Sequence, residues 1–285
     1  MSITLTISTY NWPAALELVL KSVSQQTRLP DEVIIADDGS GDVTRHLIER
    51  LAQDFPVPLR HIWQQDQGFR LARSRNRAIA AARGDYIIII DGDMVLHPQF
   101  IADHASAARL DSFVQGSRVL TSPKARDRML AGQLTRLRFF DPSLDRRRHT
   151  LRMMPLSRLL LSMSRTTSKV SGTKGCNQAW WRSDLLRLNG YDERMQSWGR
   201  EDTELVLRAF HAGLQRRSLR FSGLAFHLYH EERHQDGASA NDVYVAETRA
   251  TRARRCALGI DQHLAEFVST PAADLRPTAR QQTSA

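Results

Sequence analysis

Two acidic turns follow apolar segments that are predicted to be strands. Asp91-Gly92-Asp93 comes directly after the apolar run Tyr86 to Ile90, and Asp37-Asp38 follows Glu32 to Ala36. Two carboxylates separated by a glycine can both reach one hard cation, and Mg²⁺ or Mn²⁺ held by oxygen ligands bridges readily to a diphosphate. Gly92 would let the backbone approach such a ligand closely. Each pattern also occurs in ordinary exposed turns, so neither decides the function alone.

A third acidic pair, Glu201-Asp202, follows Trp198-Gly199 at the predicted start of a helix. One of these carboxylates, held ionised, could accept the proton of an attacking hydroxyl group. Alternatively, both only stabilise the first turn of the helix through its dipole. His227 and His230 lie at the end of a short predicted strand, either as plain surface residues or as imidazole ligands to the same cation.

The elements that must position these residues alternate between strand and helix over the first hundred residues. The predicted strands are 3–8, 32–36, 59–63 and 86–90, and the predicted helices begin after Asn11, near Val43 and at Leu71. We expect Asn11 to cap the first helix and Gly84 to close the third. This alternation predicts an α/β fold with a parallel sheet, in which ligands bind at the carboxyl ends of the strands.

The remainder of the chain divides by composition. Residues 121–171 are predicted to form a basic helical insertion, which is either packed on the domain or shaped as an acceptor-side lid or an anionic-membrane patch. Residues 172–268 resume ordered structure, with a short strand at 224–228 and one long polar helix at 242–267. Residues 269–285 are expected to be a disordered tail.

The composition of the chain limits the classes of protein to which it can belong. The 285 residues suit one large domain or two small ones, and the two cysteines give no disulfide framework. The net charge of +9 attracts polyanions such as nucleotide phosphates, anionic lipid or nucleic acid, or is merely a solvated surface. Without a signal-peptide pattern or an apolar run of roughly 20 residues, we expect a cytoplasmic protein, with peripheral contact at the inner face of the membrane left open.

Taken in order, these motifs resemble glycosyltransferase family two enzymes of the GT-A fold. The first 120 residues are similar to the nucleotide-sugar-binding half of those enzymes. Residues 172–268 would be the acceptor-binding and catalytic half of the same domain, and the part from Gly172 to His230 resembles their carboxyl-terminal galactosyltransferase-type module. The resemblance implies a Rossmann-like, mostly parallel central sheet flanked by helices, with a helical insertion and a C-terminal helix.

The resemblance also implies roles for individual residues. Asp93 would be the principal metal ligand, assisted by Asp91 and His230, with His227 ranked second; the metal would be Mn²⁺ or Mg²⁺. Asp202 would be the catalytic base, and Glu201 would bind an acceptor hydroxyl or acetamido group. Trp198 and Gly199 would form an acceptor wall. The residues implied in donor binding are Ser8, Thr9, Tyr10, Asp38, Arg70, Arg75, Asn76, Asp91, Gly92 and Asn177.

The activity that the resemblance implies is an inverting transfer of sugar from a nucleotide-sugar, most simply a UDP-sugar, to a hydroxyl of a glycan or lipid-linked acceptor. Synthesis of bacterial surface polysaccharide or lipopolysaccharide is the expected setting. One alternative is a metal-dependent nucleotidyltransferase, although residues 1–12 contain no glycine-rich phosphate loop. Another is a non-catalytic polyanion-binding protein, but the sequence has no zinc-ligand spacing or basic-aromatic motif, so we expect no nucleic-acid partner.

Overall fold

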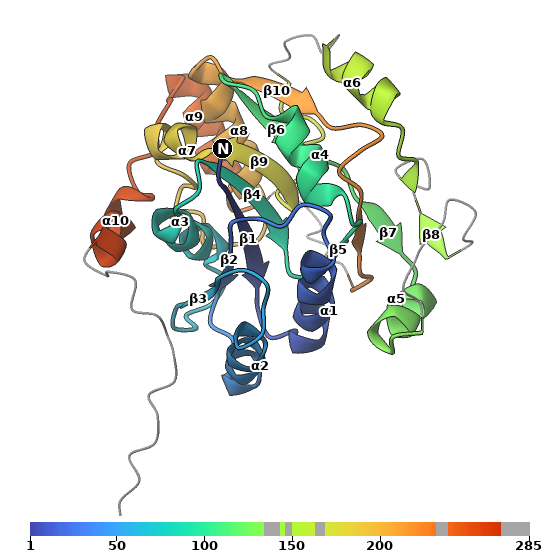
Figure 1. Ribbon diagram of the computed structural model, residues 1–285. Coiled ribbons are helices and arrows are strands. Elements are labelled where there is room, and N and C mark those ends of the chain that lie inside the picture. Colours follow the sequence, from blue (N-terminus) through green and yellow to red (C-terminus); the bar gives the residue numbers. More distant parts are fainter. Residues whose placement is uncertain (134–142, 146–149, 163–168, 232–238, 269–285) are drawn as a thin grey trace, which may run out of the picture.

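The structure, a computed structural model, describes residues 1–133, 143–145, 150–162, 169–231 and 239–268. Its core is a seven-stranded sheet in the order β10-β6-β9-β4-β1-β2-β3, beside a second sheet ordered β5-β11-β7-β8. In the first sheet β1, β2, β3 and β4 are parallel, and only β9 runs antiparallel to its neighbours. The predicted α/β fold with a mostly parallel central sheet is confirmed (Figure 1).

The strands are short and mostly apolar. They are β1 (Ile3–Thr9), β2 (Glu32–Asp37), β3 (Leu59–Trp63), β4 (Tyr86–Asp91), β5 (Met94–Leu96), β6 (Ser112–Gln115), β7 (Val119–Thr121), β8 (Leu144–Asp145), β9 (Asn177–Trp181), β10 (Gln215–Ser218) and β11 (Ala225–His227). The helices are α1 (Pro13–Ser24), α2 (Asp42–Ala52), α3 (Leu71–Ala81), α4 (Phe100–Ala107), α5 (Pro123–Leu130), α6 (Met154–Ser162), α7 (Arg182–Leu188), α8 (Glu201–His211), α9 (Asp242–Thr251) and α10 (Asp261–Val268).

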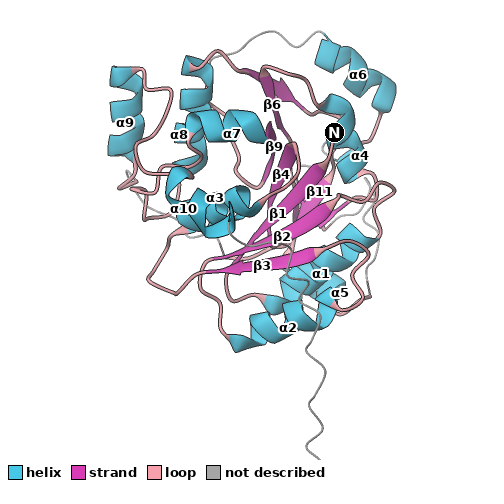
Figure 2. Ribbon diagram, turned by 60° about the vertical axis from the view of Figure 1, so that its left-hand side comes forward, coloured by secondary structure: helices cyan, strands magenta, loops and turns pink. Residues whose placement is uncertain are grey.

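Strand β4 shows why the chain folds into layers. Its side chains alternate between the two faces of the sheet, so Ile88 and Ile90 join one buried cluster while Ile87 and Ile89 join the other. Helices α1, α2 and α4 cover the first face, and α3, α7 and α8 cover the second (Figure 2). A strand that is buried on both faces needs an unbroken apolar sequence, which is what residues 86–90 provide.

Three local predictions are wrong. Asn11 does not cap α1: its backbone is left-handed (φ 47°) and its Oδ1 accepts a hydrogen bond from the Gly41 N–H, so it ties two loops together. Gly84 does not close α3, which ends at Ala81 and is followed by an extended Ala82. A Cβ at Gly84 would lie 2.6 Å from the backbone nitrogen of Thr4, so the glycine permits close packing on β1.

The predicted long helix at 242–267 is two helices, α9 and α10. Arg252 adopts a left-handed conformation after α9, and the following segment packs beneath α7. A Cβ at Gly259 would collide with the Asn189 carbonyl oxygen, which shows how closely this segment approaches. Tertiary packing therefore overrides the local helical pattern.

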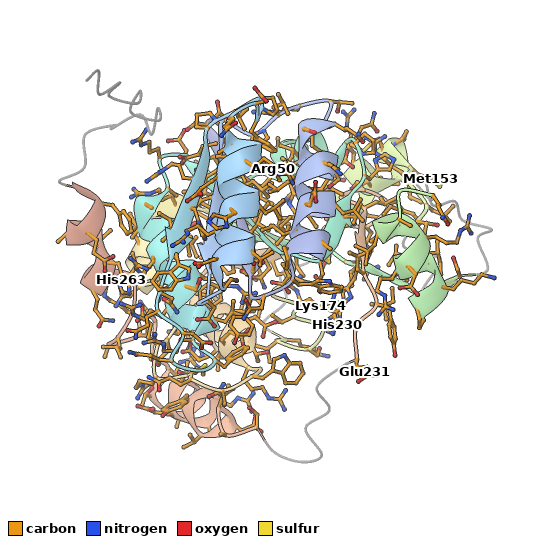
Figure 3. All side chains as sticks on the ribbon, turned by 90° about the horizontal axis from the view of Figure 1, so that it is seen from below. Arg50, Met153, Lys174, His230, Glu231 and His263 are labelled. Carbon is orange, nitrogen blue, oxygen red and sulfur yellow. The ribbon has the colours of Figure 1, made fainter. Side chains whose placement is uncertain are left out.

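The predicted basic insertion at 121–171 contains helices α5 and α6 and the short strand β8, which pairs with β7. The predicted tail at 269–285 lies outside the described residues. Among the helices that the structure describes, none is long and apolar enough to span a bilayer. The carboxyl ends of β1, β2 and β4 point to one end of the molecule, so the acidic turns that follow them lie there together. Figure 3 views the molecule from that end.

Candidate functional site

Arg75, on α3, contacts residues from four parts of the chain: Ser8, Asp91, Tyr191 and Glu201. We call these five residues the Arg75 centre. Its Nε donates to Ser8 Oγ (3.1 Å), its Nη2 lies 2.8 Å from Asp91 Oδ1, and its Nη1 lies 3.3 Å from Glu201 Oε1. The guanidinium also lies over the Tyr191 ring, 5.2 Å from its centroid. Because the side chain of Arg75 is almost completely buried, these carboxylates compensate a charge that water cannot reach.

A second group, which we call the Asp93 group, consists of Asp93, His227 and His230. Their ligand atoms all lie within 4.8 Å of one another, and both imidazole Nε2 atoms are 3.3 Å from Asp93 Oδ2. The pairing of β11 with β5 brings His227 opposite Met94, one residue after Asp93. His230 is labelled in Figure 3, beside Glu231. The structure thus brings together three of the four residues expected at a metal.

The Asp93 group fits a divalent cation by its chemistry. Asp93 Oδ1 is buried and has no hydrogen-bond partner, so it is available as a ligand. His230 Nδ1 lies 3.0 Å from the Glu231 carbonyl oxygen, which can only accept, so Nδ1 carries a proton. His230 Nε2 faces Asp93 Oδ2: it donates to that carboxylate when the ring is protonated, and in the neutral ring it is free to bind a metal. The hydrogen bond with Asp93 raises the pKa of His230, whereas burial lowers the pKa of His227.

Asp91 is not part of the Asp93 group. Its Oδ1 is held by Arg75, and its side chain is about one-third exposed. Asp91 therefore lies between the Asp93 group, two residues along the chain, and the Arg75 centre. A carboxylate in this position could still turn one oxygen toward a bound donor.

The turn before α8 sets the position of the third acidic pair. Gly199 (φ 89°) and Arg200 (φ 77°) are both left-handed, and the Asn241 side-chain amide donates to the carbonyls of Ser197 and Gly199. This sharp turn directs Glu201 inward, where it is buried. The turn thus explains why a glycine precedes the acidic pair.

Asp202 lies on the same side of the site as Arg75. A Cβ built on Gly175 would lie 3.2 Å from Arg75 Nη1 and 3.4 Å from Asp202 Cβ, so the glycine leaves room where the three elements converge. Asp202 Oδ1 accepts from the Thr203 backbone N–H (2.6 Å). Arg75 therefore lies close to Asp202 and also contacts Asp91, and Cys176, next to Gly175, interacts electrostatically with both Asp91 and Asp93.

Glu201 has an unusual electrostatic setting. Burial raises its pKa to about 7, Asp202 adds to this effect, and Arg75 opposes it. Its Oε2 is buried without a hydrogen-bond partner among the described residues. A buried carboxyl oxygen without a partner is suited to accept a hydrogen bond from a polar group of a ligand.

The residues expected to hold the nucleotide lie along the ends of β1 and β2. Buried Asp38 accepts from Gln64 Nε2 (2.6 Å) and from the Arg70 backbone N–H (2.9 Å), and burial raises its pKa. Tyr10 is half-exposed and its hydroxyl donates to Asp66 (2.9 Å). The Thr9 carbonyl accepts from the Asp38 N–H, which joins these two turns.

Other residues expected at the donor make contacts within the protein. The Asn76 amide holds both backbone groups of Tyr191, and the Asn177 amide bonds His104 and the carbonyls of Ser117 and Gly223. Both asparagines are fully buried. They position the Arg75 centre and the β6–β7 loop rather than presenting an amide to solvent. Similarly, the close approach at Gly92 is to the Ser8 carbonyl, which a Cβ would meet at 2.8 Å.

Two further residues of the site, Arg118 and Tyr191, were not predicted from the sequence. Arg118, between β6 and β7, bonds Cys176 Sγ (3.4 Å); burial lowers its pKa, but Cys176, Asp91 and Asp93 raise it on balance. Tyr191 is buried under Arg75, and its hydroxyl has no hydrogen-bond partner among the described residues. Neither follows an acidic motif or a strand end that the sequence marks, so only the folded arrangement reveals them.

Two families match the chain. Glycosyl transferase family 2 matches residues 4–161, and the family described as the N-terminal domain of galactosyltransferase matches residues 158–231. Chondroitin synthase of Escherichia coli is 26% identical over 270 residues, which is 85% of this chain and 37% of that protein. Validoxylamine A glucosyltransferase of Streptomyces hygroscopicus subsp. limoneus is 27% identical over 73% of this chain and 48% of that protein. The chain thus spans less than half the length of these two relatives.

Solved structures share the fold. S. aureus TarS in complex with UDP-GlcNAc has a TM-score of 0.60 at 18% identity, covering 94% of this chain and 72% of that one. GalNAc-T7 with UDP, GalNAc and Mn²⁺ has a TM-score of 0.61 at 17% identity, covering 87% and 48%. These neighbours are GT-A glycosyltransferases, so the predicted GT-A fold is confirmed. The match to the first family covers residues 4–161, which is more than half of this chain. The chain therefore belongs to glycosyl transferase family 2.

Proposed function

We propose that this glycosyltransferase moves a sugar from a nucleotide-sugar, with UDP as the nucleotide, to a hydroxyl group of a glycan, with inversion at the anomeric carbon. The observation that carries the proposal is the juxtaposition of the Asp93 group with the Arg75 centre and Asp202. One side of the site carries three possible cation ligands, and the other side carries Glu201, which contacts Arg75, and Asp202, which lies beside Gly175.

Asp93, His227 and His230 would hold the cation. A bound divalent ion would neutralise charge on the departing nucleoside diphosphate, Lewis-acid assistance worth several kcal/mol. Because Mg²⁺ prefers oxygen ligands in a strict octahedron, a donor set with two imidazoles favours Mn²⁺. The Mn²⁺ in the structures of GalNAc-T7 and of the Pyrobaculum calidifontis mannosyltransferase supports this choice.

On the opposite side, Asp202 accepts the proton of the acceptor hydroxyl as its oxygen attacks the anomeric carbon. General base catalysis of this kind contributes roughly 10²–10⁴-fold. Glu201 binds a second polar group of the acceptor through its free Oε2, and half-exposed Trp198 forms part of the acceptor wall. Arg75 holds Asp91 and Glu201 in place, which keeps the two halves of the site in register.

The proposed nucleotide and the proposed product class are supported by similar proteins. The TarS complexes with UDP-GlcNAc and UDP support a UDP-sugar, while the mannosyltransferase complex with GDP-Man is a counterexample within the same fold. Chondroitin synthases of two bacteria and hyaluronan synthase of Pasteurella multocida support a polysaccharide product. Bacterial surface polysaccharide or lipopolysaccharide is the acceptor class that we propose.

A donor screen tests the proposal. Each nucleotide-sugar is incubated with the chain and Mn²⁺, and the released nucleotide is identified. We expect release of UDP from one UDP-sugar, dependent on Mn²⁺ and on Asp93. Release of pyrophosphate from a nucleoside triphosphate and a sugar phosphate would instead identify a nucleotidyltransferase, and the proposal would fail.

A further inference from the structure

The positive charge of this chain is concentrated in one segment. Residues 146–183 contain nine Lys and Arg residues and no Asp or Glu. Those nine equal the formal net charge of the whole chain, +9, so the rest of the sequence is balanced. Helix α6 lies within this segment. Of these nine cations, Arg158 on α6 belongs to the exposed surface described next, and the other arginines of that surface come from neighbouring parts of the fold.

Four arginines, which we call the arginine face, lie around α6 and the edge strand β10. Burial lowers the pKa of Arg217, and nearby Arg109 lowers it further, which places these two cations together. The Met153 N–H donates to the Phe221 carbonyl, and Ser157 Oγ bonds Ser222 Oγ, so the start of α6 packs beside the end of β10. The arginine face consists of Arg109, Arg158, Arg217 and Arg220; Arg216 points to the other side of β10, where it donates to the Ser171 carbonyl.

The arginine face has no acidic counterpart. Across the part of the chain that the structure describes, none of its four members lies within ion-pair distance of a carboxylate, although Asp111 is only two residues from Arg109 in the sequence. By contrast, Arg152 at the start of the same segment is neutralised by Asp103 at 2.7 Å. Unpaired cations on one face favour an anionic ligand from outside the molecule.

Apolar side chains stand among these arginines. Leu110 is 71% exposed, Leu159 is 54% exposed and Met153 is 49% exposed. In α6, Ser157 and Leu161 are buried, Met154, Leu156 and Leu160 are half-buried, and Arg158 and Leu159 face outward. Figure 3 shows Met153 at the edge of the molecule. Exposed apolar residues interleaved with arginines suit an interface between headgroups and acyl chains, and nucleic acid would gain nothing from the leucines.

The arginine face lies away from the reacting groups. Arg217 interacts electrostatically with Tyr86, which begins β4, whereas Asp91 ends that strand. Six residues of strand span roughly 17 Å at about 3.3 Å per residue. In Figure 1, α6 and β10 both lie at the top, where β1 begins, and its carboxyl end points the other way. The face therefore does not line the acceptor side of the site.

From this arrangement we infer that the arginine face is a membrane-docking surface, which binds anionic phospholipid headgroups while Met153, Leu159 and Leu110 enter the bilayer interface. The proposal goes beyond the sugar transfer, because it concerns a surface about one strand length from the Asp93 group. It would hold the enzyme against a membrane with the opposite end, which carries the site, free to accept substrate.

The test is sedimentation of the full chain with vesicles of phosphatidylcholine alone or with one-third phosphatidylglycerol, at low and high salt. We expect binding only to the anionic vesicles, weakened by salt. Arg109→Gln with Arg220→Gln should weaken the partition roughly 25-fold, since each removed cation accounts for about fivefold. Leu159→Asp should weaken it roughly tenfold.

Matched controls lie on α2. Arg45→Gln with Arg50→Gln removes the same charge from an exposed surface, and Val43→Asp places the same acid at a residue that is 72% exposed. Both controls should bind vesicles as the unmodified chain does. The proposal would be overturned if the α2 variants weakened vesicle binding as much as the arginine-face variants do. It would also be overturned if the chain bound duplex DNA as tightly as vesicles and Leu159→Asp did not change that binding. Mn²⁺-dependent donor hydrolysis should be unchanged in every variant, which separates this test from that of the proposed reaction.

Discussion

The guanidinium of Arg75 lies 3.3 Å from the carboxylate of Glu201, although 126 residues of chain separate them. Through its second contact, with Asp91, this one side chain links the acidic turn after β4 to the first turn of α8. The turn after β4 and the first turn of α8 are therefore joined through the buried guanidinium of Arg75.

Replacing Arg75 should cost stability as well as activity. Arg75→Met leaves Asp91 and Glu201 without their partner, and breaking a buried pair in this way costs roughly 3–5 kcal/mol. Arg75→Lys keeps the charge but not the fork geometry, so we expect a smaller loss. Urea unfolding measures both. Arg45→Met, at an exposed arginine, is the control and should change the free energy of unfolding by about 0.5 kcal/mol or less. A stable Arg75→Met protein would contradict the role of this pair.

Asp202→Asn tests the base. We expect unchanged affinity for the nucleotide and loss of transfer by roughly 10²–10⁴-fold, because an amide cannot take up the acceptor proton. Calorimetric titration with UDP and Mn²⁺ measures the first quantity, and product formation measures the second. Asp184→Asn, in the first turn of α7, is a matched change that should leave both intact. Turnover near that of the unmodified chain in Asp202→Asn would exclude Asp202 as the base.

The Asp93 group should bind Mn²⁺ without nucleotide. Because three ligand atoms already lie within 4.8 Å of one another, paramagnetic resonance of added Mn²⁺ should report binding by the free protein. Asp93→Ala should abolish that signal together with metal-dependent donor binding, and His230→Gln should weaken affinity roughly 10–100-fold. His46→Gln, at an exposed histidine on α2, should have no effect. Undiminished Mn²⁺ binding by Asp93→Ala would place the metal elsewhere.

Glu201 should impose a pH dependence on stability. Its pKa rises from 4.5 to about 7 on folding, chiefly through burial, so the folded state binds more protons than the unfolded state between these values. The contribution of Glu201 is fully present below pH 4.5 and is lost as pH rises toward 7, by up to roughly 3 kcal/mol. Glu201→Gln mimics the protonated group. The difference in unfolding free energy between the two proteins should therefore change across pH 4.5–7 and be constant above it; a constant difference throughout would refute the assignment.

Sequence alone determined the layered fold and the positions of its acidic turns. The unbroken apolar run at Tyr86 to Ile90 can only be a strand buried on both faces, and carboxylates that end neighbouring parallel strands must lie at one edge of the sheet. Predictions from local sequence were wrong where tertiary packing competes with local preference. Asn11 does not cap α1, and the predicted helix from 242 to 267 is divided by the left-handed Arg252 and the close approach of Gly259.

Only the tertiary structure decided which side chains face one another. Asn76 and Asn177 carry the residue types of a donor site, yet their amides are committed to buried hydrogen bonds, while Tyr191 and Arg118 belong to the site without any local signal. Strand and helix patterns repeat every few residues, so neighbouring residues reveal them. A contact such as that between Arg75 and Glu201 depends on how the whole chain closes, because burial and charge compensation arise only after distant segments pack together.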